Sequence, residues 1–223
     1  WNSFNLGDHV GDDPAAVATN RQRLTQTLGV RPVFLRQVHG WGVRALPCAD
    51  NTEADAVWSE QTDTACCIMV ADCLPILLSD AQGQVVAAAH AGWRGLCGQQ
   101  GTGVLESLLS QLRQRHPQIS WLAWLGPAIG PRAYEVGVDV RQAFVANRAD
   151  AERHFHPITG RAGKWWCDLP SLARDRLMGL GVTQIWGNDG SDDWCTHTRP
   201  DLYFSHRRDG RSGRMAAAIF LHH

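Results

Sequence analysis

Two histidines and one cysteine stand at the ends of apolar runs, where a fold can hold side chains rigidly. His39 precedes Gly40, Cys73 follows Asp72 at the end of an apolar run, and His90 precedes a Gly-rich turn. Strand ends beside such turns are common places for functional sites. Imidazole and thiolate are the ligands that zinc prefers, and a catalytic zinc takes three protein ligands and keeps one open position. The three positions match no local metal motif, so a hydrogen-bonded core role for either histidine stays open.

A second group of polar residues lies in the C-terminal third of the chain. Arg207 and Arg208 stand beside Gly-rich turns, and Arg214 follows a further glycine. Guanidinium groups in such turns favour the planar recognition of phosphate or carboxylate, and a solvated turn is the alternative. Glu135 lies in a loop rich in Gly and Pro, where it is either a base or an exposed charge.

Apolar periodicity predicts the elements that carry these residues. Asp13 before Pro14 is typical of a helix start and Gly29 of a helix end, so we expect a helix over 14–28. Helical spacing also predicts helices over 98–116, 138–147 and 169–180. Short apolar runs rich in branched residues predict strands over 33–38, 54–58, 65–70, 74–78, 85–89, 121–125, 182–186, 202–205 and 215–221.

The composition is that of a globular protein. The chain has 223 residues, of which 44% are hydrophobic, and a formal net charge of -1. It can therefore build a large core, and it carries no positive field that would attract nucleic acid or an anionic membrane. Its apolar runs are too short to span a bilayer. No linker or repeat divides the order of elements, so we expect one α/β domain over residues 1–223.

The ends of the chain indicate how it was processed, and its cysteines indicate its cellular compartment. It begins at Trp1 without a methionine or signal sequence, which is typical of a trimmed chain, and the closing His222 and His223 are typical of a tag remnant. Seven cysteines, an odd number spread along the chain, indicate reduced thiols rather than a disulfide framework. We therefore expect a cytoplasmic protein.

The segments around these residues are distinctive. They read QVHG over 37–40, ADCLP over 71–75, HAGWRG over 90–95, GP over 126–127, YEVG over 134–137 and RRDG over 207–210. In these segments the chain resembles the bacterial YfiH-like family, also called the multicopper polyphenol oxidase or laccase-domain family, whose relatives include the human laccase-domain-containing protein. The resemblance runs from Trp1 to the last strand, and the HAGWRG block is its most specific part. The family's Arg-bearing Gly-Gly segment, which stands just before the position of Trp1, is absent here.

The resemblance implies both an activity and a fold. The activity is that of a purine nucleoside phosphorylase on adenosine, inosine, guanosine and S-methyl-5′-thioadenosine, joined by adenosine deamination. The resemblance also implies zinc at positions that fall on His39, Cys73 and His90. The implied fold is the one shared with the catalytic domains of cytotoxic necrotizing factors, two packed mixed β-sheets flanked by helices, which agrees with the α/β (α+β) pattern of elements.

This activity assigns roles to further residues of the chain. Phosphorolysis needs an anion pocket near the ribose, and the candidates by charge are Arg44, Arg94, Arg207 and Arg208. A zinc ion with an open position lowers the pKa of bound water, which accounts for deamination. The catalytic candidates are Asp72, Cys73 and Glu135. We hypothesise that one of the two carboxylates, Asp72 or Glu135, transfers protons.

Three other functions remain open. A copper-dependent polyphenol oxidase would need several coppers, yet only His154 and His156 form a closely spaced histidine pair. An amidase that edits UDP-MurNAc-linked peptidoglycan precursors would use Cys73 as nucleophile and His90 as base. Zinc content separates this amidase from the phosphorylase, because a metal-bound thiolate is a poor free nucleophile. A metal-dependent binding protein would keep all three ligands without turnover. As partners we expect a nucleoside and phosphate, and for the chain itself a monomer or weak homodimer.

Overall fold

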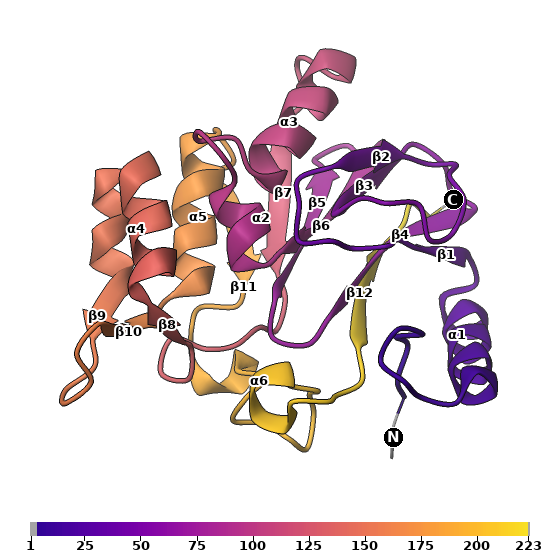
Figure 1. Ribbon diagram of the computed structural model, residues 1–223. Helices are drawn as coiled ribbons and strands as arrows, with labels where there is room; N and C mark the ends of the chain where they lie inside the picture. The colour runs from indigo at the N-terminus through magenta and orange to yellow at the C-terminus, as the bar shows by residue number, and fades with distance from the viewer. Residues whose placement is uncertain (1–3, 223) are drawn as a thin grey trace.

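The structure is a computed structural model that describes residues 4–222 (Figure 1). Its helices are α1 (Pro14–Leu28), α2 (Trp93–Cys97), α3 (Val104–Arg115), α4 (Val138–Asn147), α5 (Leu169–Gly179) and α6 (His206–Asp209). Its strands are β1 (Arg31–Phe34), β2 (Val43–Ala45), β3 (Ala56–Ser59), β4 (Thr64–Val70), β5 (Leu74–Asp80), β6 (Val86–Ala91), β7 (Trp121–Leu125), β8 (Glu135–Gly137), β9 (Phe155–Pro157), β10 (Lys164–Cys167), β11 (Gln184–Gly187) and β12 (Met215–Ile219). The first three residues of the family resemblance and His223 of the expected tag remnant lie outside the described residues.

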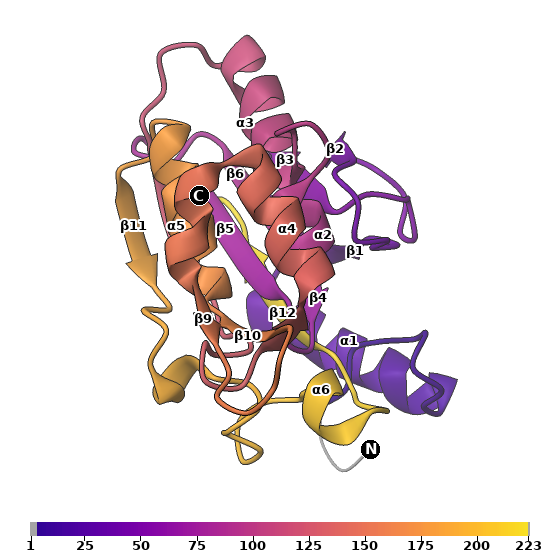
Figure 2. The same ribbon diagram turned by 60° about the vertical axis from the view of Figure 1, so that its left-hand side comes forward.

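Two mixed β-sheets pack face to face, and helices cover their outer sides. The larger sheet has the order β11-β7-β5-β6-β3-β2, and the smaller has the order β1-β4-β12. Helices α2, α3 and α5 pack on the outer face of the larger sheet, and α1 packs on the outer face of the smaller one (Figure 1). This confirms the expected α/β fold. An unpredicted antiparallel sheet, β8-β10-β9, lies at one end of the molecule (Figure 1), and Figure 2 shows β9 and β10 below α4 and α5.

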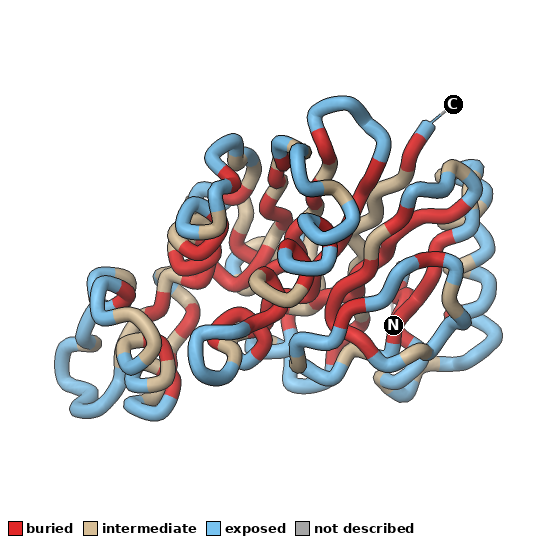
Figure 3. Tube along the Cα trace, turned by 90° about the horizontal axis from the view of Figure 1, so that it is seen from above, coloured by how far each residue is buried: buried red, intermediate tan, exposed pale blue. Residues whose placement is uncertain are grey.

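The layer between the sheets is built by strands that are buried on both sides (Figure 3). In β4, Cys66, Ile68 and Val70 pack against the larger sheet, whereas Cys67 and Met69 pack toward α1. The alternation follows from the two-residue period of a strand, and a strand covered on both faces is expected to be apolar throughout. The ends of these buried strands therefore hold any polar side chain at a fixed position.

The helix predictions hold where capping residues mark the ends. The Asp13 carboxylate accepts a hydrogen bond from the Ala15 N–H at 2.9 Å, and Gly29 ends α1 with a φ of +72°. The helix predicted over 98–116 begins later than expected, because Gly98 has a φ of +66° and the chain turns until Gly103. The Gly103 N–H then donates to the Glu106 carboxylate at 2.8 Å, which starts α3 at the next residue.

Three strand predictions are wrong in part or in full. The strand predicted over 33–38 ends at Phe34, because the backbone of Arg36 bonds to Thr52 and Ala54 instead of β4, and the Val38 N–H donates to the Asp55 carboxylate. The strand predicted over 202–205 is a turn in which the backbone N–H groups of Leu202 and Tyr203 both donate to the carbonyl of Arg199. The strand predicted over 182–186 is shifted to β11, where it pairs in parallel with β7.

All seven cysteines are free thiols in the structure. Within residues 4–222, none of the helices combines the length and the apolar character needed to cross a bilayer.

Candidate active site

Strand register brings Cys73 and His90 together. Cys73 immediately precedes β5, and β5 pairs with β6 so that Leu74 lies opposite Ala91 and Pro75 opposite His90. Alternate residues of a strand share one face, so His90 projects from the same side as Ala88, toward the smaller sheet, and Cys73 packs on that side too. The two side chains therefore meet at the edge of the space between the sheets.

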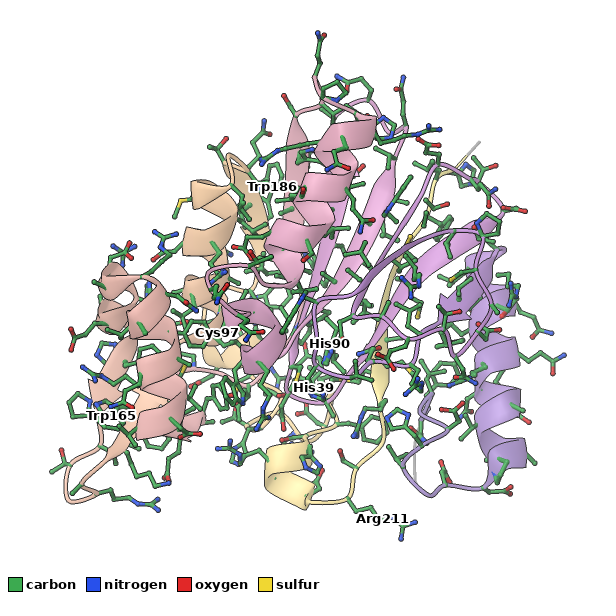
Figure 4. All side chains as sticks on the ribbon, turned by 45° about the horizontal axis from the view of Figure 1, so that its top comes forward. His39, His90, Cys97, Trp165, Trp186 and Arg211 are labelled. Carbon is green, nitrogen blue, oxygen red and sulfur yellow. The ribbon has the colours of Figure 1, made fainter. Side chains whose placement is uncertain are left out.

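His39 completes the group from the loop that follows β1. Its Nε2 lies 3.8 Å from the Cys73 sulfur, and its ring meets that of His90 edge-on at a centroid distance of 4.8 Å. Figure 4 shows the two histidines side by side at the ends of the central strands. One ligand atom from each of the three side chains lies within 4.8 Å of the others. The structure thus brings together the three residues that the sequence analysis proposed as metal ligands.

A fully buried carboxylate, Asp55, holds both histidines in place. Its Oδ1 lies 2.8 Å from Nδ1 of His90 and accepts the backbone N–H of His39 at 2.9 Å. Its Oδ2 accepts the backbone N–H groups of Val38 at 3.2 Å and Gly40 at 2.8 Å. Burial on its own would raise the pKa of Asp55, but His90 and these backbone donors hold it below the usual value. With Nδ1 of His90 occupied, its Nε2 is left for the side of Cys73.

Glycines in the HAGWRG block allow α2 to approach the loop that carries His39. A Cβ on Gly95 would lie 2.7 Å from the carbonyl oxygen of Gly40, and a Cβ on Gly92 would lie 3.0 Å from the Cys73 sulfur. Neither contact leaves room for a larger side chain. The N-terminus of α2 can therefore rest directly on the His39 loop.

Charge interactions within the group change the pKa values of Cys73 and His90. Burial on its own would raise the pKa of the Cys73 thiol, but His90 and His39 lower it to about 6. Burial would likewise lower the pKa of His90, but Cys73 and Asp55 raise it to about 9. In the metal-free site a thiolate and an imidazolium thus stabilise each other near neutral pH.

The group lies at a cavity of about 410 Å³, a size typical of small-molecule sites. The cavity is lined by His9, Gln37, His39, Met69, Val70, Ala71, Asp72, Cys73, His90, Trp93, Arg94, Ile129, Tyr134, Leu169, His206, Arg207 and Arg214. Among these described lining residues Asp72 is the one acidic side chain, whereas three are arginines. The cavity is therefore suited to an anionic ligand.

Asp72 lies in the cavity wall with both carboxylate oxygens engaged. It is 9% exposed and has a φ of +88°. Its Oδ1 accepts the Thr196 hydroxyl at 2.6 Å, and its Oδ2 accepts the backbone N–H of Arg207 at 2.6 Å. These bonds tie the start of α6 to the loop before Cys73. Asp72 thus holds a neighbouring segment in place, a role that the sequence analysis did not consider.

The four arginines proposed for phosphate binding divide into two pairs. Arg94, whose guanidinium lies 4.5 Å from the Trp93 ring centroid, and Arg207 both line the cavity. Arg44 does not line it, because it lies on the exposed part of β2 and donates to the carbonyl of Val43. Arg208 does not line it either, because its guanidinium is used by loop carbonyls and by Asp209.

Glu135, proposed as a proton carrier, lies on β8 and outside the cavity lining. Its carboxylate pairs with Arg161 and, at 3.8 Å, with Lys164. Its backbone carbonyl accepts a hydrogen bond from Nη1 of Arg207 at 2.8 Å. The contribution of this residue to the cavity is therefore through its main chain.

Several residues of the site were not identified from the sequence. Asp55 gave one signal, a carboxylate inside an apolar run, which needs buried partners. Tyr134 stood in the YEVG segment without a role, and Arg214 was noted beside a glycine but was not among the four phosphate candidates. Nothing in the local pattern distinguished His206, which enters the cavity at the start of α6.

A family model described as multi-copper polyphenol oxidoreductase laccase matches residues 1–222. The chain belongs to this family.

Members of this laccase family are similar to the chain over nearly its whole length. A protein of Escherichia coli named purine nucleoside phosphorylase YfiH is 47% identical over 226 residues, which cover 99% of this chain and 87% of that protein. A Haemophilus influenzae protein named purine nucleoside phosphorylase is 44% identical over 222 residues, 98% of this chain and 87% of that protein. A crystal structure of a Neisseria meningitidis protein has a TM-score of 0.90 at 41% identity and covers 100% of this chain and 88% of that one.

The donor set of this laccase-family chain fits a metal ion. Four-coordinate zinc with bonds of about 2.0–2.3 Å brings its ligand atoms to about 3.3–3.6 Å of one another, so the trio would contract by up to about 1.5 Å around the ion. Imidazole and thiolate suit zinc and copper better than magnesium or calcium. Within the described residues, His39, Cys73 and His90 form the one group of three or more such side chains that could hold an ion.

Proposed function

We propose that the chain is a zinc-dependent purine nucleoside phosphorylase that acts on adenosine, inosine, guanosine and S-methyl-5′-thioadenosine, with adenosine deamination as a second reaction. The observation that carries the proposal is the single cavity that joins the ligand trio to three arginines. The names of the Escherichia coli and Haemophilus influenzae relatives support the substrate class.

Phosphorolysis requires this cavity to bind phosphate and to hold the nucleoside beside it. A phosphate oxygen forms a bond to C1′ of the ribose while the bond from C1′ to N9 breaks, and the bonding electrons leave with the purine, which takes up a proton. The cationic arginines favour the bound dianion and place it beside the sugar. The half-buried Trp93 offers an aromatic face for the purine. Holding both reactants in one site accounts for much of the rate gain expected of such an enzyme.

His39, Cys73 and His90 would hold the zinc ion. When bound there, zinc supplies a Lewis acid with an open coordination position, the chemistry that hydrolytic removal of the adenosine amino group requires. Asp55 keeps the proton of His90 on Nδ1, so that Nε2 can act as a ligand. The main-chain bonds from the His39 loop to Asp55 hold the other imidazole at the same point.

The test combines metal analysis with product analysis. We would measure zinc content and the release of free base from adenosine and inosine, with and without phosphate, in the wild type and in Cys73→Ala. Cys48→Ala is the matched control, since Cys48 does not line the cavity. Stoichiometric zinc and phosphate-dependent base release, lost in Cys73→Ala alone, are expected. A zinc-free protein without nucleoside turnover would overturn the proposal.

A second candidate, the cysteine amidase that edits peptidoglycan precursors, is favoured by one specific observation. Asp55, His90 and Cys73 form a chain in which a buried carboxylate orients an imidazole and the imidazole lowers the pKa of the thiol. This is the arrangement of an activated nucleophile. Activity that survives metal removal and is blocked by alkylation of Cys73 would support the amidase over the phosphorylase.

A further inference from the structure

The cavity arginines differ from most others in the chain in their partners. Many arginines outside the cavity pair with a carboxylate, as Arg176 does with Glu106 at 2.8 Å. Arg94, Arg207 and Arg214 have no carboxylate partner among residues 4–222. Asp72, the acid in the same lining, already accepts one hydrogen bond on each oxygen. The positive charge of the cavity is therefore not neutralised by the described side chains around it.

Arg214 is the most deeply placed of the three. Its side chain is half-buried, and Nη1 donates to the carbonyls of Ser212 and Gly213 at 2.9 and 3.0 Å. Its other guanidinium nitrogens donate to none of the described residues. Burial lowers the pKa of Arg214, whereas the charges of Cys73 and Asp72 raise it, so the guanidinium lies within electrostatic reach of Cys73, one of the three proposed metal ligands. A half-buried guanidinium with free donors is stabilised by an oxyanion.

Arg207 approaches the same cavity from α6 and is fixed at three points. Its backbone N–H donates to Asp72, its Nη1 donates to the carbonyl of Glu135, and its guanidinium lies 5.2 Å from the ring centroid of Tyr134. Its remaining guanidinium donors have no partner among the described residues. Such a preorganised cation loses less conformational entropy on binding than a mobile surface arginine.

We propose that Arg214 and Arg207 form a phosphate-binding subsite beside the metal ligands, and that Asp72 is the positioning residue that aligns Arg207 with it. This subsite rests on the proposed function, in which phosphate is a co-substrate, and it names the residues that bind the phosphate. It leaves Arg44 and Arg208 outside the subsite. The ligand is a phosphate oxyanion, and we assign it to free inorganic phosphate.

The test measures binding directly, without turnover. Calorimetric titration of the purified metal-loaded protein with inorganic phosphate compares the wild type with Arg214→Gln, Arg214→Lys and Arg207→Gln. Arg44→Gln is the matched control, an arginine outside the cavity. Loss of one charge-assisted contact is expected to weaken phosphate binding about tenfold or more in both glutamine variants, less in Arg214→Lys, and not at all in Arg44→Gln. Thermal unfolding of each variant shows that it is folded, and Arg207→Gln keeps the test open if Arg214→Gln does not fold.

The outcomes separate this subsite from the enzyme activity. Phosphate binding that depends on Arg214 and Arg207 supports the subsite even in a protein without nucleoside turnover. Phosphate-dependent turnover in a protein whose glutamine variants bind phosphate like the wild type would overturn the subsite and leave the phosphorylase standing. Adenosine 5′-monophosphate serves as a second probe. If it binds through Arg214 while inorganic phosphate does not bind, the phosphate belongs to a nucleotide and the assignment to free phosphate is wrong.

Discussion

Replacement of Asp55 by asparagine tests how the site is held together. The substitution keeps the shape of the side chain but exchanges one acceptor oxygen for an NH₂ group. Four donors converge on the two oxygens of the wild-type carboxylate: the N–H groups of Val38 and Gly40 on Oδ2, and those of His39 and His90 on Oδ1. An amide cannot satisfy both groups at once.

The cost follows from the two orientations that the amide can take. If its oxygen replaces Oδ1, the N–H groups of Val38 and Gly40 both lose their acceptor, at about 1–3 kcal/mol each. If its oxygen replaces Oδ2, only the N–H of His39 loses its acceptor, and Nδ1 of His90 accepts from the amide. The second orientation is cheaper, but it moves the proton of His90 to Nε2, the atom that faces Cys73. We therefore expect a loss of about 1–3 kcal/mol in the free energy of unfolding and a 10–100-fold (order-of-magnitude) loss of zinc affinity.

Urea unfolding of the metal-free protein and zinc titration against a competing chelator measure the two effects. Asp50→Asn is the control, because its carboxylate accepts the Phe34 N–H at 2.9 Å and pairs with Arg31 away from the cavity. That variant should lose stability without losing zinc affinity. Wild-type zinc affinity in Asp55→Asn would refute the assignment of Asp55 as the residue that sets the His90 proton.

Four further outcomes are expected. In metal-free protein, the rate of alkylation of Cys73 should rise with pH around a midpoint near pH 6, because the lowered pKa keeps the thiolate populated above that pH. Peptide mass spectrometry measures the alkylated fraction, and a midpoint near the ordinary thiol value would contradict the ion pair. Gly95→Ala should cost about 1–3 kcal/mol in unfolding free energy, whereas Gly42→Ala, whose Cβ would make an ordinary 3.7 Å contact, should cost less in the same urea experiment. Asp72→Asn should raise the KM for phosphate about tenfold with zinc content unchanged; an unchanged KM would remove its positioning role. Glu135→Gln should leave kcat within about twofold, since its carboxylate is ion-paired outside the cavity, and a large loss would restore Glu135 as a proton carrier.

Local signals explain which elements the sequence predicts well. The helix α1 was predicted with its observed bounds because Asp13, Pro14 and Gly29 act within a few residues of the ends. The strands β8, β9 and β10 have three or four residues each and escaped prediction. Such short strands form because pairing partners are supplied by the rest of the fold, and no short window of sequence contains that information.

The site shows the same division between local and long-range information. His39, Cys73 and His90 were proposed as ligands with the help of the family resemblance, since their convergence depends on the pairing of β5 with β6. The arginines were chosen by charge, and charge alone does not distinguish Arg44 on an exposed strand from Arg214 beside the cavity. What separates them is burial and the partners of each guanidinium, which only the packed structure defines.

The position of His39 favours the metal site over the cysteine nucleophile. An activated thiol needs one base, and His90, oriented by Asp55, already meets that need. A second imidazole 3.8 Å from the same sulfur is more than that chemistry requires. Yet His39 has a φ of +60°, a left-handed backbone conformation that costs a non-glycine residue roughly 1–3 kcal/mol, and the fold offsets this cost with three N–H bonds to a buried carboxylate. A strained residue held in this way is explained if His39 is the third ligand of a metal ion.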